Sequence, residues 1–339
     1  MMTTGVAEVP WRGRALLAVL LAVLVVAPFV VSSYLLSVLI LVLYFAYLGQ
    51  AWNIMMGFAG QLSLGHALYF GLGAYTAAAL YTKFGVTPWA GMAAGAIVSA
   101  VAGAFIGALG FRFRIGGVYF ALLTIAFAEF TRILFDHIDW VGGTAGFFLP
   151  VSNRDTNDLW NLRGDPTMFY YVWLAGAGGV LALCRMLLSS RLGYYWLAIR
   201  EDELAAQALG INTFRYKIAA VMLSAALTAC GGVVYAFYNN NLFPEPIFSV
   251  ARSIDMLLGA VTGGVGTLMG PIVGAFILTP LGEGLTVALE PLQDLFKLDG
   301  IKQVFYGLCV VLIVIFQRHG VWPYLARKLG LRQLIGART

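Results

Sequence analysis

Three polar side chains stand close together in an otherwise apolar, glycine-rich stretch, GQLSLGHALYFGLGAY at residues 60–75. Gln61, Ser63 and His66 supply an amide, a hydroxyl and an imidazole, each able to donate and accept hydrogen bonds. Such groups could line a pathway and hydrogen-bond a zwitterionic solute. They could equally satisfy backbone groups that are freed where glycines interrupt a helix. The residue types leave both roles open.

Three charged residues lie inside long apolar runs. Glu129 and Arg132 are three residues apart, a spacing that makes them neighbours on one helix face, and we expect an ion pair that lowers the cost of burying both. Glu283 has no obvious partner in sequence. Glu283 or Glu129 could serve in ion coupling, which keeps open the hypothesis of an ion-coupled secondary transporter or channel acting without an ATPase.

No pattern typical of an enzyme is present. The histidines at positions 66, 137 and 319 form no metal-binding spacing, and there is no nucleophile elbow or paired-carboxylate site. The three cysteines fall in apolar runs and suggest neither a metal site nor a disulfide framework. A Gly-x-x-x-x-Gly-Lys-Ser/Thr phosphate loop is also missing. We therefore expect a non-catalytic chain with no metal and no cofactor of its own.

The composition indicates what must position these residues. Of the 339 residues, 60% are hydrophobic and 11% charged, whereas soluble domains carry about 25% charged residues. A membrane-spanning helix needs ~20 apolar residues. The sequence thus predicts an all-α integral membrane protein, a polytopic helical bundle of about ten transmembrane spans. We place the spans near residues 15–32, 33–56, 60–82, 87–111, 115–135, 167–189, 217–239, 252–270, 271–290 and 301–317.

The first apolar run and the two glycine-rich runs have features beyond their hydrophobicity. The first follows Arg12 and Arg14 as a signal peptide would, but no convincing cleavage site comes after it, so we expect a retained span. Glycine-rich helix starts recur in both halves, at 60–75 and in GGVGTLMGPIVGA at 263–275. Paired glycine-broken helices are typical of a transport pathway, although packing by small residues is the alternative.

Lys and Arg predict the topology. With a cytoplasmic N-terminus and ten spans, fourteen of them lie on the cytoplasmic side and six on the far side, with Arg132 inside a span, as the positive-inside rule requires. The modest net charge of +5 therefore reflects topology and not nucleic-acid binding. We expect one transmembrane domain over residues 1–339, with an external loop at 136–166, a cytoplasmic coupling segment at 190–216 and a basic cytoplasmic tail at 318–339.

Residues 200–212, REDELAAQALGIN, predict a short cytoplasmic helix of about two turns. Glu201, Asp202 and Glu203 suit a helix N-terminus, alanines favour the helix, and Gly210 ends it. Leu204 shares a face with Ala208, with Ile211 just beyond. Such a helix could dock into a groove on a partner. The alternative is a helix lying on the lipid surface, which the acidic start disfavours.

The same stretch resembles a known motif. Glu203, Ala205, Ala206 and Gly210 are similar to the coupling motif of ABC importer permeases, Glu-Ala-Ala followed after three residues by Gly, except that Leu204 is inserted. The stretches at 60–75, 117–130, 200–212 and 263–275 together resemble the LivM-type permeases of branched-chain amino acid importers. The resemblance extends from about residue 60 to residue 275.

The resemblance implies a set of partners. A second, LivH-like permease would pair with this chain, two cytoplasmic ATPases would bind the ATP, and a periplasmic binding protein would deliver the solute. It places the chain in a bacterial inner membrane, working by alternating access. The solute would be a branched-chain amino acid or a related small molecule. In the outer loop, Val141 and Ala145 replace polar residues that are usual in this family, so the solute is not identified.

Overall fold

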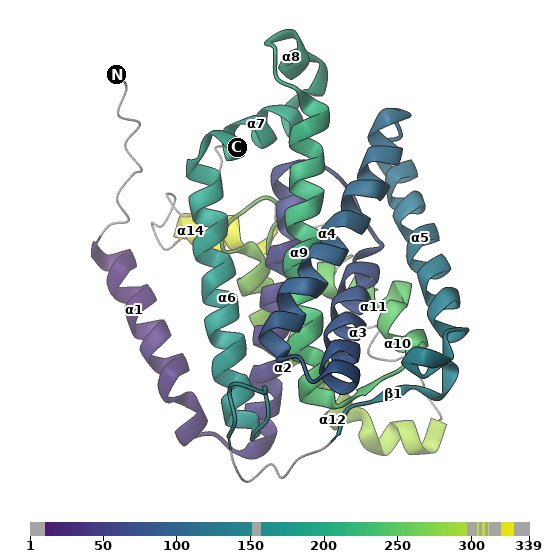
Figure 1. Ribbon diagram of the computed structural model, residues 1–339. Coiled ribbons are helices and arrows are strands. Elements are labelled where there is room, and N and C mark those ends of the chain that lie inside the picture. Colours follow the sequence, from purple (N-terminus) through teal and green to yellow (C-terminus); the bar gives the residue numbers. More distant parts are fainter. Residues whose placement is uncertain are drawn as a thin grey trace. The chain divides into compact units, whose positions relative to one another are not determined.

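The computed structural model describes residues 11–150, 157–296 and 320–328, together with positions 304, 307, 308 and 311. Helices dominate this part of the chain (Figure 1). The chain divides into two compact units. The first unit comprises Met1–Gln50, Tyr170–Ser189 and Leu258–Thr339, and the second comprises Ala51–Phe169 and Ser190–Leu257.

Helices make up most of the described part of the first unit. They are α1 (Trp11–Val26), followed by the short turn η1 (Ala27–Phe29), most of α2 (Ser33–Asn53), most of α6 (Pro166–Ser189), α12 (Gly270–Phe296) and the short α14 (Val321–Lys328). Ala46 of α2 packs against Ala275 of α12. Trp322 and Ala326 of α14 pack against Met269, just before α12.

The second unit is built on α3 (His66–Phe84), α4 (Pro88–Arg112), α5 (Val118–Asp136) and α9 (Thr213–Asn239). Helices α3, α4 and α9 pack against one another. At the crossing of α3 and α9, a Cβ on Gly73 would overlap the Ala229 carbonyl, and one on Gly232 would overlap the Phe70 carbonyl. Small residues are therefore required there, as is common where membrane helices approach closely.

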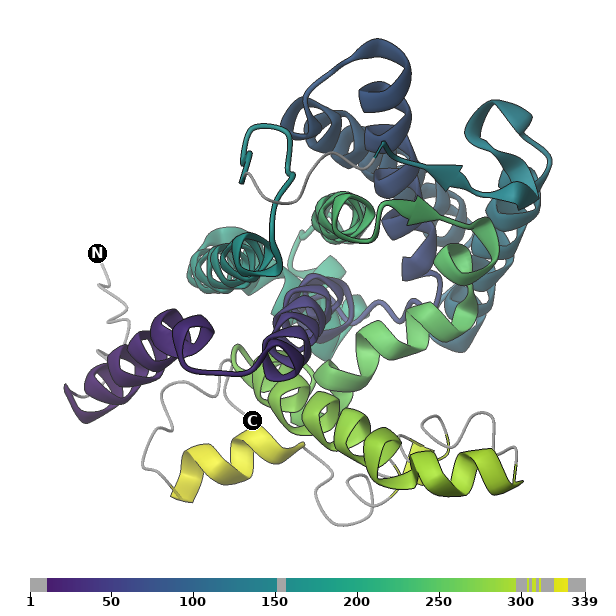
Figure 2. The same cartoon turned by 90° about the horizontal axis from the view of Figure 1, so that it is seen from below.

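Shorter elements complete the second unit. A π-helical turn, η2 (Ile54–Phe58), continues α2, and α7 (Arg191–Glu201) and α8 (Glu203–Ala208) precede α9. The remaining elements are η3 (Asp139–Val141), η4 (Gly143–Ala145), β1 (Phe147–Phe148), β2 (Asn241–Leu242), α10 (Pro244–Phe248) and α11 (Val250–Gly263), which runs into the first unit. Strands β1 and β2 pair antiparallel, with Phe147 opposite Leu242. Figure 1 shows this ribbon at the end of the unit opposite α8, and Figure 2, seen from below, shows its two arrows side by side.

Six helices of the described chain are long and apolar enough to cross a membrane. They are Ser33–Phe58, Pro88–Arg112, Val118–Asp136, Pro166–Ser189, Thr213–Asn239 and Gly270–Val287. An all-helical membrane protein is thus confirmed, but the number of ten spans is not. The 14-residue α11 is about 21 Å long at 1.5 Å per residue, short of the ~30 Å hydrocarbon core. The predicted span at 301–317 lies mostly outside the described residues.

The two loops expected on opposite sides of the membrane lie at opposite ends of the second unit. α5 ends at Asp136 near the β1–β2 ribbon, whereas α7 and α8 stand at the other end (Figure 1). The described parts of residues 136–166 therefore lie far from the coupling segment. The tail from 318 onward is described only over residues 320–328, and the assignment of residues 1–339 to one domain stays a prediction.

Candidate functional site

The expected short helix is present as α8, separated from α7 by a single residue. Asp202 caps its N-terminus: one carboxylate oxygen accepts hydrogen bonds from the backbone N–H of Leu204 at 2.9 Å and of Ala205 at 3.0 Å, a role that aspartate fills well. Gly210 follows α8 with φ of 83°, a left-handed conformation common after helices. One detail of the prediction was wrong, since Glu201 is the last residue of α7.

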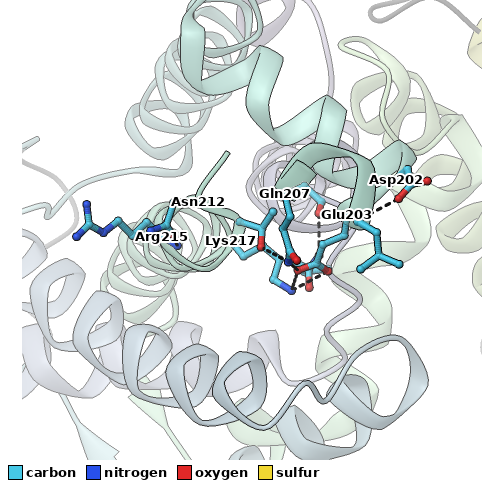
Figure 3. Close-up of polar contacts among 10 residues, drawn as sticks. Asp202, Glu203, Gln207, Asn212, Arg215 and Lys217 are labelled. Atoms are coloured by element: carbon cyan, nitrogen blue, oxygen red, sulfur yellow. Dashed lines mark hydrogen bonds and ion pairs between the residues drawn. The ribbon is translucent and has the colours of Figure 1, made fainter. Parts of the chain in front are cut away.

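An ion pair joins α8 to α9. Figure 3 shows the Lys217 ammonium group directed at the carboxylate of Glu203, with Nζ–O distances of 2.9 and 3.0 Å. The same ammonium lies 4.4 Å from the centroid of the Phe111 ring. Gln207 adds a second tie, donating to the Thr213 hydroxyl at 2.9 Å. The Glu203 carboxylate therefore points toward its own chain, where its ion pair with Lys217 holds α8 against α9.

The two alanines of the coupling motif differ in exposure to solvent. Ala205 is exposed, whereas Ala206 is only 2% exposed and packs inside the chain. The largest exposed apolar groups are Leu204 at 77% and Leu209 at 82%. The predicted exposure of Leu204 agrees with the structure, but Leu209 was not singled out by sequence and Ile211 is half-buried. α8 and the residue that follows it thus expose three apolar side chains, Leu204, Ala205 and Leu209.

Gln61 and Ser63 lie in a non-helical break, residues 59–65, between η2 and α3, and His66 begins α3. Side chains from three other helices satisfy the backbone there. Thr124 Oγ1 of α5 accepts from Leu64 N–H at 3.1 Å, and Ser253 Oγ of α11 accepts from Ala67 N–H at 2.9 Å. Trp52 of α2 donates its indole N–H to the Ser63 carbonyl at 2.9 Å. These three polar groups at the break are therefore partnered within the second unit.

His66 is the centre of this network and is 1% exposed. The Ser224 hydroxyl donates to the Ala51 carbonyl at 2.7 Å, so its oxygen can accept from His66 Nε2–H at 2.9 Å. His66 Nδ1 then accepts from the Ser63 hydroxyl at 3.0 Å, and Ser63 Oγ accepts from Gly65 N–H at 3.4 Å. These bonds are complete for a neutral imidazole with its proton on Nε2. The ring ties the break to α9 and α2.

Gln61 differs from the other two candidates. Its side chain is half-buried, and its amide nitrogen donates to the nearby Ala59 carbonyl at 2.9 Å. Ser63 and His66 are buried and bonded to the framework. Of the three predicted path residues, Gln61 is therefore the one whose side chain reaches an accessible surface.

The second predicted glycine break is also present, in the first unit. α11 ends at Gly263 and α12 begins at Gly270. Between them, the Thr267 hydroxyl donates to the Gly264 carbonyl at 2.7 Å and accepts from Gly270 N–H at 3.0 Å. Thr267 thus caps the N-terminus of α12, in the manner usual for a hydroxyl at a helix start.

Glu129 and Arg132, two of the charges inside the spans, pair locally. Arg132 bonds Glu129 as expected, and it also bonds Asp136 at 2.9 Å, one turn further along α5. Glu283 is half-buried in α12. Within the described residues, no three His, Cys, Asp or Glu side chains gather closely enough to hold a metal ion.

Two residues that make these contacts, Lys217 and Ser224, have little or no signal in the sequence. Lys217 looks like one more basic residue at the end of a span, and only its contact with Glu203, 14 positions earlier, reveals its role. Ser224 is a small hydroxyl in an apolar helix, 158 positions from His66. Its role depends entirely on which helices become neighbours.

Comparison with known proteins identifies a family whose model matches most of the chain. The model of the family described as "branched-chain amino acid transport system / permease component" matches residues 34–315. The high-affinity branched-chain amino acid transport system permease proteins LivM of Salmonella typhimurium and Escherichia coli K12 are each 29% identical over 342 residues, covering 95% of this chain and 77% of theirs.

A second type of permease is also similar. LivH of Escherichia coli K12, a permease protein of the same transport system, is 30% identical over 122 residues, covering 36% of this chain and 39% of LivH. No solved structure matches the chain. The similarity thus extends over nearly the whole chain for LivM and over about a third of it for LivH.

Proposed function

The chain belongs to the family of permease components of branched-chain amino acid transport systems, and we propose that it forms half of the translocation path of an ATP-driven importer. α8 would be the docking site for a cytoplasmic ATPase. Two such ATPases would bind and hydrolyse the ATP, and a periplasmic binding protein would deliver the solute. The chain itself would carry out no catalysis.

The exposed apolar surface of α8 supports this proposal most directly. Leu204 and Leu209 are among the most exposed large apolar side chains of the described chain. The helix next to them is held in place by the cap that Asp202 forms and by the ion pair of Glu203 with Lys217. An apolar helix face of this kind fits a hydrophobic groove on a partner. Glu203 and Ala206 would set the position of α8, while Ala205 and Gly210 would allow the partner to approach closely.

The location follows from the same assignment. If α8 meets a cytoplasmic ATPase, the opposite end of the second unit, with the β1–β2 ribbon, faces the binding protein. We place the protein in a bacterial inner membrane with both termini in the cytoplasm, as the distribution of Lys and Arg indicates. The second half of the path would come from a LivH-like permease, and lipid would cover the remaining apolar surface.

The path would be lined in part by the helix break at 59–65. We assign Gln61 as the candidate for contact with the solute, because it is the accessible member of the three. Ser63 and His66 would hold the break in shape. The solute is a branched-chain amino acid or a related small molecule, with selectivity resting largely on the binding protein.

An ion-coupled transporter is not favoured by these findings. Glu129, one of its two candidate carboxylates, is paired with Arg132, and the family consists of components of multi-subunit transport systems.

Reconstitution tests the proposal. The chain, its second permease, the ATPases and the binding protein should together show ATP-dependent uptake in proteoliposomes, whereas the chain alone should show none. Leu204→Glu combined with Leu209→Glu should lower ATPase co-purification by at least about tenfold, since two apolar contacts are each worth about 1.5–3 kcal/mol. Leu192→Glu on α7, 37% exposed, is the matched control. Ion-driven flux through the chain alone would refute the proposal.

A further inference from the structure

Arg200 joins the coupling segment to the helix break. It lies in the last turn of α7, yet its Nη1 donates to the Gly57 carbonyl, 143 positions earlier in the chain, at 2.7 Å. The contact also involves backbone. A Cβ built on Gly60, which has φ of 70°, would lie 3.2 Å from Arg200 Cα and 3.0 Å from its Cγ. The end of α7 and the start of the break are therefore in direct van der Waals contact.

The electrostatics of this contact explain why an arginine stands there. Gly57 is in η2, whose end is also the end of the long helical segment begun by α2. The last carbonyls of a helix have no intrahelical donor, and the helix dipole is negative there. A guanidinium group satisfies such a carbonyl and offsets the dipole. The other end of the guanidinium bonds the exposed Glu201 carboxylate at 2.6 Å.

Hydrogen bonds restrain the position of α8 relative to the end of α7 that carries Arg200. Asp202, two positions later, caps α8 through its side chain and donates its own N–H to the Ala198 carbonyl of α7 at 3.1 Å. α7 is itself attached to α9, because Trp196, which is fully buried, donates to the Tyr216 carbonyl at 2.7 Å. A displacement of α8 must therefore be shared by the end of α7 that carries Arg200.

The break is attached to α9 at a second place. His66 bonds Ser224, and Ser224 follows Lys217 by seven residues, about 10.5 Å along an α-helix. The coupling segment and the break thus meet the same stretch of α9, one through Lys217 and the other through Ser224. Arg200 links the coupling segment directly to the residues at the start of the break, through its hydrogen bond to the Gly57 carbonyl.

We propose that Arg200 is a positioning residue that transmits movement of α8 to the break at 59–65, so that the polar groups there move together with the coupling segment. This inference rests on the proposed function, because it requires α8 to be the element that the ATPase moves. It adds a specific mechanical link between the ATPase-facing helix and the candidate path residue Gln61.

The test uses the full reconstituted importer and measures three quantities: ATPase co-purification, solute-stimulated ATP hydrolysis and solute molecules transported per ATP hydrolysed. Arg200→Gln should leave co-purification unchanged and lower the number of solutes per ATP by about tenfold, the effect of losing one hydrogen bond to a charged group. Arg200→Lys, which keeps the positive charge, should recover at least part of it. Arg191→Gln, an exposed arginine at the start of α7, should change nothing.

A crosslink supplies a second, independent measurement. The Cβ built on Gly60 lies 3.3 Å from Arg200 Cβ, close to the ~3.5–4.5 Å that a disulfide spans. Gly60→Cys with Arg200→Cys, in a background without the native cysteines, should be uncoupled when reduced and regain coupling when oxidised. Gly60→Ala with the native Arg200 carries the same backbone strain at φ of 70° and is the matched control. A reduced protein with full coupling, or an oxidised one locked without transport, would overturn the inference. Lost ATPase co-purification in the wild-type importer would instead refute the proposed function.

Discussion

The Lys217 ammonium group pairs with the Glu203 carboxylate across the joint between α8 and α9, at 2.9 Å, and the two partners are unequally buried. The Lys217 side chain is 10% exposed and that of Glu203 is 39% exposed. Lys217 also lies over the Phe111 ring, which offers partial compensation to a cation. The pair therefore holds α8 in place, but losing one partner should not cost the same as losing the other.

Glu203→Gln should destabilise the joint more than Lys217→Met. The first change leaves a nearly buried ammonium without its counter-charge, at a cost of about 1–3 kcal/mol. The second leaves a carboxylate that water can reach, at a cost of about 1 kcal/mol or less. Limited proteolysis within residues 200–212 of the purified protein, together with thermal unfolding, measures both. Equal effects of the two variants would contradict this account, and the double variant should resemble Lys217→Met.

Ala205 and Ala206 should respond differently to the same substitution. Ala206→Trp places a large ring where the side chain is 2% exposed, so overpacking should lower stability by about 1–3 kcal/mol. Ala205→Trp lies on the exposed face of α8 and should leave thermal unfolding unchanged while blocking ATPase co-purification. If Ala206→Trp unfolded at the wild-type temperature and Ala205→Trp still bound the ATPase, the assigned faces of α8 would be incorrect.

His66→Ala should act on stability, and Gln61→Ala on transport. Removing the imidazole deletes bonds to Ser63 and Ser224 and leaves a buried gap, which should cost about 2–5 kcal/mol and reduce the yield of folded protein. Gln61→Ala removes a half-buried amide and should change the KM or maximal rate of solute uptake at normal yield. Uptake assays normalised to folded protein separate the two. A stable His66→Ala protein with altered KM would return His66 to the path.

Neutralising the carboxylates in the spans should not abolish ATP-driven uptake. Glu129→Gln loses part of a local ion pair with Arg132, which retains Asp136 at 2.9 Å, so the cost should be about 1 kcal/mol or less. Glu283→Gln should likewise keep uptake within about twofold of wild type, a change of under 0.5 kcal/mol. Uptake measured with and without a proton gradient checks both variants. A gradient-dependent loss in either would revive the ion-coupled alternative.

The amino-acid sequence by itself determined the class of the protein and the places where function concentrates. The share of apolar residues allows only a membrane protein, and the glycines at 60–75 and 263–275 mark real helix breaks. Asp202 and Gly210 mark the ends of α8, because capping depends on residues within one turn of the helix. The Glu129–Arg132 pair is local in the same way. Each of these features depends on near neighbours along the chain.

Only the tertiary structure decided which side chains face a partner and which face the chain itself. A helix of six residues, such as α8, has too few turns to show an apolar face by periodicity, so the burial of Ala206 and the exposure of Leu209 had no sequence signal. The contacts of His66 with Ser224 and of Arg200 with Gly57 join positions more than 140 residues apart. They exist because close packing of the helices of the second unit brings those particular groups within hydrogen-bonding distance.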